Sequence, residues 1–143
     1  MVLETSDVIS IFAFIFTVIA VVVAAAAAGQ AKKANNLTLL KPRKEVYDAF
    51  VKLKAHMTQH AQYADIHEID KFNKFSNDAV LYFPDEIVKQ VSKYHSLCKR
   101  IVIESERNPG DSEAVEELLE AEEKLAKDIV FKIENLIGNL ARA

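Results

Sequence analysis

Apolar residues fill one long stretch near the start of the chain, with no charged residue among them. The stretch runs from Val8 to Ala28, and its only polar members are Ser10 and Thr17. A helix of this length spans roughly 31 Å, which matches the hydrocarbon core of a bilayer. The pattern predicts a transmembrane helix, and alanine and other helix-favouring residues after it should extend the helix to about Leu40.

A cleaved signal peptide is the alternative interpretation of such a stretch. A signal peptide has a positively charged start, an apolar region of about 7 to 15 residues and a cleavage site of small residues. Here Glu4 and Asp7 precede the stretch without any Lys or Arg, and the stretch is too long. Ala26 and Ala28 resemble a cleavage site, but the other two requirements fail. We therefore expect an uncleaved anchor.

Residues 41–143 show a different pattern, in which apolar side chains recur at spacings of three and four, as in amphipathic helices. We expect Pro42 to end the first helix, because the residue before a proline avoids the helical conformation. The strong turn Asn108-Pro109-Gly110 should separate the last two helices. The predicted helices cover about 44–62, 65–82 and 84–107, followed by a long, coiled-coil-like helix that starts at Asp111 or Ser112.

Helix-start signals support two of these boundaries. Asp65, with Glu68 three residues later, resembles a capping box. Pro84 is tolerated in a first helical turn, and the acids Asp85 and Glu86 favour its positive end. The predicted fold is all-α: an N-terminal transmembrane helix with a juxtamembrane extension (1–40), then an antiparallel bundle of about four helices (41–143).

The predicted core of this bundle is rich in aromatic side chains. Its expected aromatic members are Tyr47, Phe50, Phe72, Phe75, Tyr82 and Phe83, with Phe131 as a further candidate. Glu122 interrupts the apolar stripe of the last helix. We therefore expect the acidic first half of that helix to project past the bundle.

Charge is distributed unevenly along the chain and sets the expected orientation. No basic residue precedes the apolar stretch, and all 18 Lys and Arg follow it. The positive-inside rule then places the C-terminal domain in the cytoplasm and the N-terminus outside, in an inner (plasma) membrane. Five cations near the membrane are expected to contact anionic headgroups, at about 1 kcal/mol for each well-placed charge. They are Lys32, Lys33, Lys41, Arg43 and Lys44.

Small residues fill the second half of the apolar stretch. Ala24 and Ala28, and likewise Ala25 and Gly29, are four residues apart. This spacing lets helix backbones approach closely, so we expect these residues to pack on another membrane helix; a thin apolar face without a partner is the alternative.

Candidate chemistry is sparse. His56 and His60 share a helix face but lack an HExxH pattern, so we expect solvent-facing histidines rather than a metal site. His95 and Cys98 could form a thiolate–imidazole pair, but Cys98 falls on an apolar stripe and should behave as a small buried hydrophobe. With three glycines, the chain has no phosphate-cradling loop. No catalytic residue, cofactor, metal or small-molecule substrate is predicted.

Two segments carry a resemblance to a known group of proteins. They are Lys-Pro-Arg-Lys-Glu-Val-Tyr-Asp-Ala-Phe at 41–50 and Asp-Ala-Val-Leu-Tyr-Phe-Pro-Asp-Glu-Ile at 78–87. Together with the anchor, the stretch from Lys41 to His95 resembles small bacterial single-pass membrane-anchored helical proteins, for which no activity is established. The resemblance implies that Arg43, Tyr47, Phe83 and the pair Glu86-Ile87 are structural signatures. It also implies that Val46-Tyr47 packs on Tyr82-Phe83.

The leading functional expectation is a non-enzymatic, membrane-tethered interaction or scaffold module at the cytoplasmic face. Its partners would be the bilayer and either a second copy or another protein, and the short basic stretch disfavours nucleic acid. The residues expected to contact a partner are Leu118, Leu119, Leu125 and Ile129. One alternative is a small membrane effector of the toxin or phage-defence type that oligomerises through its membrane helix. Another is an accessory subunit of a larger membrane complex, and a hidden metal protein or enzyme is the remaining one.

Overall fold

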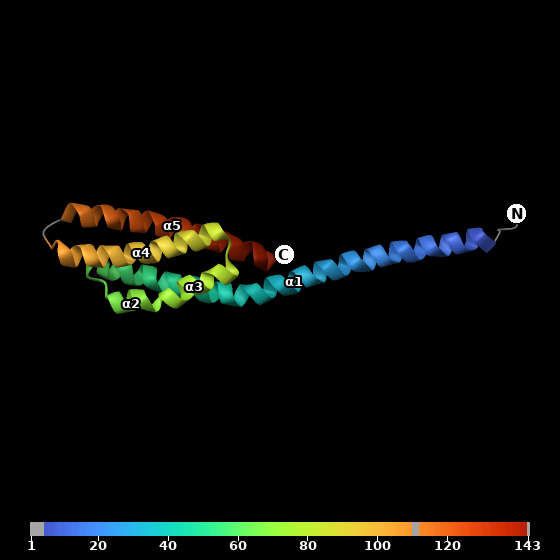
Figure 1. The fold of residues 1–143 in the computed structure, drawn as a ribbon, viewed down its shortest axis with the longest axis horizontal. Helices are drawn as coiled ribbons and strands as arrows, with labels where there is room; N and C mark the ends of the chain where they lie inside the picture. The colour runs from blue at the N-terminus through green and yellow to red at the C-terminus, as the bar shows by residue number, and fades with distance from the viewer. Residues whose placement is uncertain (1–4, 110–111, 143) are drawn as a thin grey trace. The chain divides into compact units, whose positions relative to one another are not determined.

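The computed structural model describes residues 5–109 and 112–142, and every regular element among them is helical (Figure 1). This confirms the predicted all-α class. The chain divides into two compact units, Met1–Leu37 and Thr38–Ala143. The elements are α1 (Thr5–His60), η1 (Ala61–Tyr63), α2 (Ile66–Lys71), α3 (Asn73–Tyr82), α4 (Asp85–Arg107) and α5 (Ser112–Arg142).

Helix α1 does not end at Pro42, so the predicted break is wrong. The helix includes Pro42 and continues to His60, which makes the predicted separate helix over 44–62 the last part of α1. A proline inside a helix costs about 3 kcal/mol, because it removes a hydrogen bond and crowds the preceding turn. Val46 and Phe50, one and two turns later, are buried in the core. Burial of such side chains stabilises by about 1.5–3 kcal/mol each, which offsets the cost of the proline.

The predicted helix over 65–82 is divided at Phe72. The Phe72 N–H donates to the Ile69 carbonyl at 3.1 Å, three residues back instead of four, which tightens the turn between α2 and α3. The Phe72 side chain is buried, and its ring meets Phe50 edge-on with centroids 6.2 Å apart. This contact with Phe50, a residue distant in the sequence, fixes the position of Phe72. The break at Phe72 therefore could not be predicted from local helix signals.

The predicted capping box at the start of α2 forms with a different partner. The Asp65 side chain accepts a hydrogen bond from the His67 N–H at 2.8 Å, as predicted for an N-cap. The Asp65 N–H, however, donates to Nε2 of His56 at 3.0 Å. Glu68 pairs with Lys71 instead. A histidine from α1 therefore takes the place that the sequence pattern gave to Glu68.

Helix α4 agrees with the prediction from end to end. It follows Pro84, ends before Asn108, and buries its entire predicted stripe. These buried residues are Ile87, Val91, Tyr94, Cys98 and Ile101. Helix α5 begins at Ser112, one of the two predicted starts; the other, Asp111, lies outside the described residues.

The core of the helical unit contains most of the predicted aromatic side chains. Phe50, Phe72 and Phe83 are buried, and Tyr47, Phe75 and Tyr82 pack partly buried at its edge. The prediction for Phe131 is wrong, since its side chain is 66% exposed. Ile129 and Ile133 are buried on this part of α5. Phe131 is two positions from each of them, so its side chain points about 200° away from theirs around the helix axis, toward solvent.

The acidic first half of α5 does not project past the other helices, contrary to expectation. Val115 and Glu122 are both buried, and the Tyr94 hydroxyl donates a hydrogen bond to Glu122. The Glu122 carboxyl is thus hydrogen-bonded inside the core, and the buried face of α5 includes this acidic residue.

We predict that truncating Ile129 to alanine lowers the free energy of unfolding by about 2–5 kcal/mol, because the cavity left in the core cannot be filled. Leu81, which is 69% exposed on α3, provides the matched control. Leu81→Ala should change stability by less than about 0.5 kcal/mol. Denaturant unfolding of the detergent-solubilised full-length chain measures both values, and equal values would contradict the assignment of Ile129 to the core.

Candidate functional site

The first candidate surface is the apolar part of α1. Among the described residues, the helix starting at Ser10 is long and apolar enough to cross a membrane, judged by length and composition; a signal sequence near an N-terminus meets the same criterion. Its large side chains are exposed throughout the unit, with Phe14 at 71%. Thr17 donates its hydroxyl back to the Ala13 carbonyl at 2.8 Å, so this polar group is satisfied within the helix.

The small residues on this helix present an open surface. Ala24, Ala25, Ala28 and Gly29 are all exposed. A Cβ atom added at Gly29 would meet no atom within 4 Å. The described structure therefore leaves this face accessible, and packing on a second membrane helix remains a prediction.

Four of the five cations predicted to contact headgroups are exposed: Lys32, Lys33, Lys41 and Lys44. Arg43 is different, because its Nε donates to the Tyr82 carbonyl at 2.6 Å and its guanidinium lies 5.9 Å from the Phe83 ring centroid. Partial burial lowers the pKa of Arg43 below its ordinary value. Arg43 thus links α1 to the end of α3, and its guanidinium contacts residues of the helical unit.

The four residues predicted to contact a partner lie on the inner side of α5. Ile129 is fully buried, and Leu118, Leu119 and Leu125 pack partly buried against the same core. A partner could reach Ile129 only by opening the helical unit. A surface for a partner has to be sought among exposed residues instead.

The histidine pair on α1 has a structural use. The rings of His56 and His60 lie 4.7 Å apart, and Nε2 of His56 accepts the Asp65 N–H. No group of three or more His, Cys, Asp or Glu that could hold a metal ion occurs among the described residues.

Cys98 and His95 are buried on α4 and do not form a reactive pair. Burial, together with the negative charge of Glu122, raises the pKa of Cys98 to about 12, so the thiol stays protonated at neutral pH. Nε2 of His95 lies 3.1 Å from the Ile69 carbonyl, to which it donates in its neutral form. Burial lowers the pKa of His95 and favours that form.

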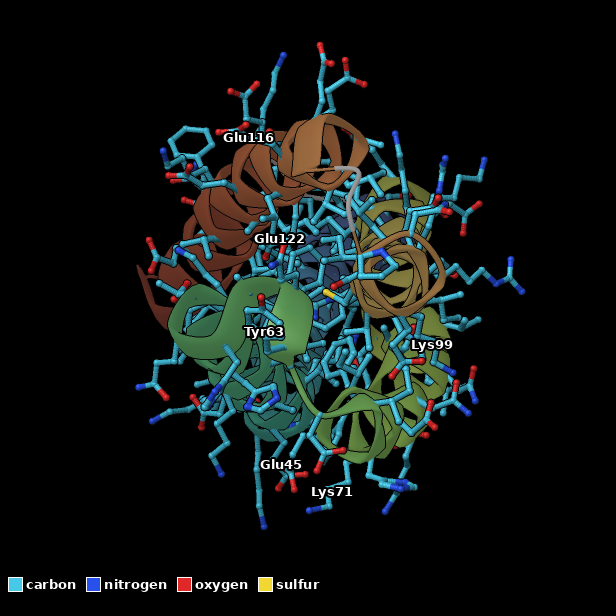
Figure 2. The ribbon with its side chains drawn as sticks, turned by 90° about the vertical axis from the view of Figure 1, so that its left-hand side faces the viewer. Glu45, Tyr63, Lys71, Lys99, Glu116 and Glu122 are labelled. Carbon is cyan, nitrogen blue, oxygen red and sulfur yellow. The ribbon has the colours of Figure 1, made fainter. Side chains whose placement is uncertain are left out.

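Sequence reasoning missed a buried polar contact between α4 and α5. The Tyr94 hydroxyl donates to Glu122, which Figure 2 shows among the helices while Glu116 of the same helix points outward. Burial is the main cause of the raised pKa of Glu122, and the Tyr94 hydrogen bond and the charge of Lys54 oppose it. An acidic residue at an apolar position of the stripe was the signal that could have revealed it.

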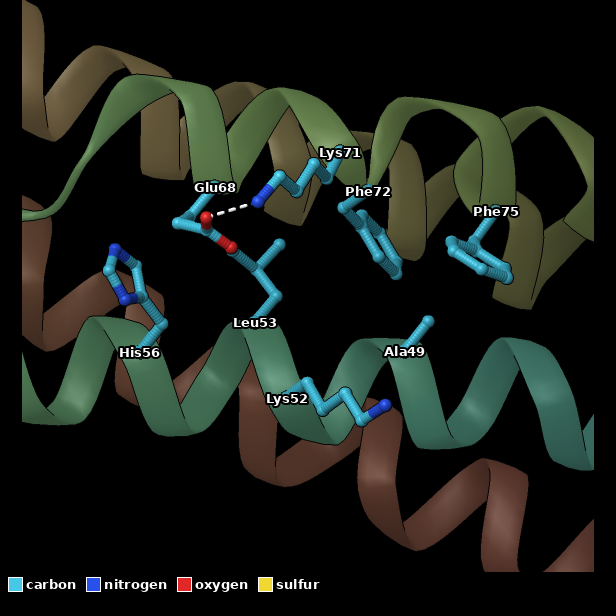
Figure 3. A pocket seen from close by; sticks show the side chains of 8 residues that line it. All are labelled: Ala49, Lys52, Leu53, His56, Glu68, Lys71, Phe72 and Phe75. Carbon is cyan, nitrogen blue, oxygen red and sulfur yellow. Dashed lines mark hydrogen bonds and ion pairs between the residues drawn. The ribbon is translucent and has the colours of Figure 1, made fainter.

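One pocket opens between α1 and the α2–α3 segment (Figure 3). Its volume of about 160 Å³ is below the roughly 300 Å³ at which ligand sites usually begin. Glu68 and Lys71, both on α2, form an ion pair along one wall of the pocket. The lining side chains are Ala49, Lys52, Leu53, His56, Glu68, Lys71, Phe72 and Phe75. This arrangement brings together no nucleophile and general base in hydrogen-bonding contact.

No protein-family model, no curated protein and no solved structure matches this chain.

We predict that Glu122→Gln stabilises the protein at neutral pH by about 1 kcal/mol, because a neutral amide can still accept the Tyr94 hydrogen bond without the cost of a buried charge. The raised pKa means that the folded state binds the proton more tightly than the unfolded state does. Wild-type stability contributed by this group is therefore complete below about pH 4.5 and decreases as the pH rises through the folded pKa. The advantage of the variant should vanish near pH 4. Paired urea unfolding curves at pH 4, 6 and 8 measure this difference, and a constant difference would contradict it.

Proposed function

We propose that this chain is a membrane-anchored helical interaction module without catalytic activity of its own. The α1 residues from about Val8 to Ala28 would span the membrane once. The second unit would act as an antiparallel bundle at the cytoplasmic face. Exposure of the large apolar side chains on α1 carries the proposal, because nothing in their own unit covers them.

The energetics of this exposed surface favour a membrane. Apolar surface in water costs about 25 cal/mol per Å², and a row of exposed Phe, Ile and Val side chains would be costly there. In the second unit, by contrast, the apolar stripes of α4 and α5 face a shared core. Thr17 fits a lipid environment because its hydroxyl is already bonded within the helix.

Charge supports the proposed orientation. Lys32 and Lys33 follow the apolar residues directly, as the positive-inside rule expects on the cytoplasmic side. Within the second unit, exposed Lys41 and Lys44 lie at the end that continues into the first unit. The end of α4 and the start of α5, which carry many acidic residues, lie at the other end of this unit (Figure 1).

The state of the candidate catalytic groups supports a non-enzymatic role. Cys98 and His95 are buried, and the Glu122 carboxyl is occupied by Tyr94. A catalytic group has to reach a bound substrate, and these three side chains do not line the pocket in Figure 3.

A membrane effector that assembles through α1 is the second candidate. The open face at Ala24, Ala25, Ala28 and Gly29 favours it, because close helix contact needs small residues without bulk in the way.

We predict that Ile15→Lys with Val18→Lys releases the chain from membranes. Each lysine near the middle of the span costs about 2.5–3.5 kcal/mol. Both positions are exposed within their unit, so the change removes no core contact. After carbonate extraction of cell membranes, the wild type and a matched Ile15→Leu/Val18→Leu variant should remain in the pellet, whereas the lysine variant should shift to the supernatant. The intact mass of the purified wild type tests the signal-peptide alternative, since cleavage would remove the apolar segment.

We predict that Gly29→Leu separates the two candidate functions. The added side chain meets open space within the described structure, so stability should be retained. If α1 assembles through its small residues, Gly29→Leu should reduce self-association in membranes and abolish any dissipation of membrane potential on expression. Expression of the wild type without loss of potential would count against the effector role.

A further inference from the structure

The connection between α1 and α2 contains a hydrogen bond to a histidine ring. Nε2 of His56, near the end of α1, accepts from the Asp65 backbone N–H at 3.0 Å. The Asp65 side chain in turn accepts from the His67 N–H at 2.8 Å and caps α2. His56 therefore holds the residue at which α2 begins.

This hydrogen bond requires a neutral imidazole. A neutral ring accepts at one nitrogen, whereas the imidazolium ion donates from both nitrogens and accepts at neither. Because Nε2 of His56 accepts, the ring carries its proton on Nδ1. Histidine is the side chain that ordinarily changes its charge between pH 5 and 8. Protonation in that range turns Nε2 into a donor that faces the N–H of Asp65, and the contact is lost.

Charged and titratable groups of both signs surround the His56 ring. On α1, the ring of His60 lies 4.7 Å away and is tilted by 44°, and Lys52 stands one turn earlier. On the α2 wall of the pocket in Figure 3, Glu68 pairs with Lys71.

The Asp65 carboxylate, in the connection itself, is hydrogen-bonded to the His67 N–H. Since cations and carboxylates both lie near the ring, the Asp65 N–H contact is the feature that separates the two protonation states of His56.

The connection that this contact closes is strained. Ala61 has a φ of 48°, in the left-handed region that residues with a Cβ atom rarely adopt. Such a conformation costs about 1–3 kcal/mol and persists only where surrounding contacts hold it. The buried Ala64 is one such contact, and its N–H donates to the Ala61 carbonyl at 3.3 Å. Asp65 is exposed, so its backbone depends on the hydrogen bond to His56.

We propose that His56 is a pH-dependent switch in the second unit: neutral His56 fixes the start of α2 on α1, and protonated His56 releases it. Acidification then loosens the α2 wall of the pocket in Figure 3, which carries Glu68 and Lys71. The proposal does not depend on the membrane anchor, because all of these residues belong to the second unit.

The test follows the Asp65 backbone amide by NMR spectroscopy of the detergent-solubilised full-length chain. Between pH 7.5 and pH 5, protection of this amide against solvent exchange should fall by about threefold to tenfold, after correction for the intrinsic exchange rate. This is the size expected for the loss of one hydrogen bond. The fall should coincide with the titration of the His56 ring, recorded from its own resonances in the same samples.

His56→Gln should abolish this pH dependence, because an amide side chain does not ionise in this range. His67→Gln is the matched control, since it removes a histidine beside Asp65 and leaves the hydrogen bond to His56 in place. The fall in protection should persist in that variant. A fall that persists in His56→Gln would overturn the proposal, as would unchanged wild-type protection while the His56 ring titrates. Loss of the pH dependence in both variants would assign it to charge near the connection and would overturn the proposal too.

Discussion

The contact between Phe50 and Tyr94 holds the helical unit together. Phe50 projects from α1, and its ring centroid lies 4.8 Å from that of Tyr94 on α4. The same Phe50 ring meets Phe72 at the junction of α2 and α3, and the Tyr94 hydroxyl reaches Glu122 on α5. One aromatic side chain on α1 is thus linked, directly or through a single intermediate, to every other long helix of this unit. Its position two turns after Pro42 explains why the helix persists through the proline.

Polar contacts determine how α4 and α5 are aligned along their lengths, which apolar packing alone does not determine. Apolar side chains in a helix interface tolerate sliding, whereas a buried carboxyl has to meet its donor. Tyr94 and Glu122 meet this requirement inside the core, and Gln90 donates to Asp128 at 2.5 Å nearer its edge. Lys132 links Asp128 to Glu86 at 2.9 and 2.7 Å further along the same two helices. These contacts agree on one alignment of α4 and α5, while the exposed ion pairs among them contribute little stability of their own.

The sequence predicted local features well and long-range features poorly. The α4 boundaries, its five-residue stripe and the Asp65 cap follow from spacing and helix-end chemistry, which neighbouring residues determine. The passage through Pro42 and the break at Phe72 depend on contacts with distant residues, which no local rule contains. Phe131 was misplaced because hydrophobicity alone does not decide which side of α5 faces inward. Of the candidate site residues, Ala24–Gly29 are exposed, as a free helix face requires, whereas Arg43, predicted to contact headgroups, donates to the Tyr82 carbonyl through a contact that no local pattern contains.

Perturbed ionisation often marks an active site, because catalysis needs groups with shifted pKa values in a cleft. Here the buried groups with shifted pKa values are Tyr94, His95, Cys98 and Glu122, and burial is the main cause for each. They belong to the core, and the pocket between α1 and α2 is lined by a different set of residues. These four buried groups therefore lie apart from that pocket. Among the described residues, the accessible groups include apolar side chains on α1 and cationic side chains near the start of the second unit. Surfaces of that kind can bind a lipid or another helix, and this is the basis of the interaction role that we propose.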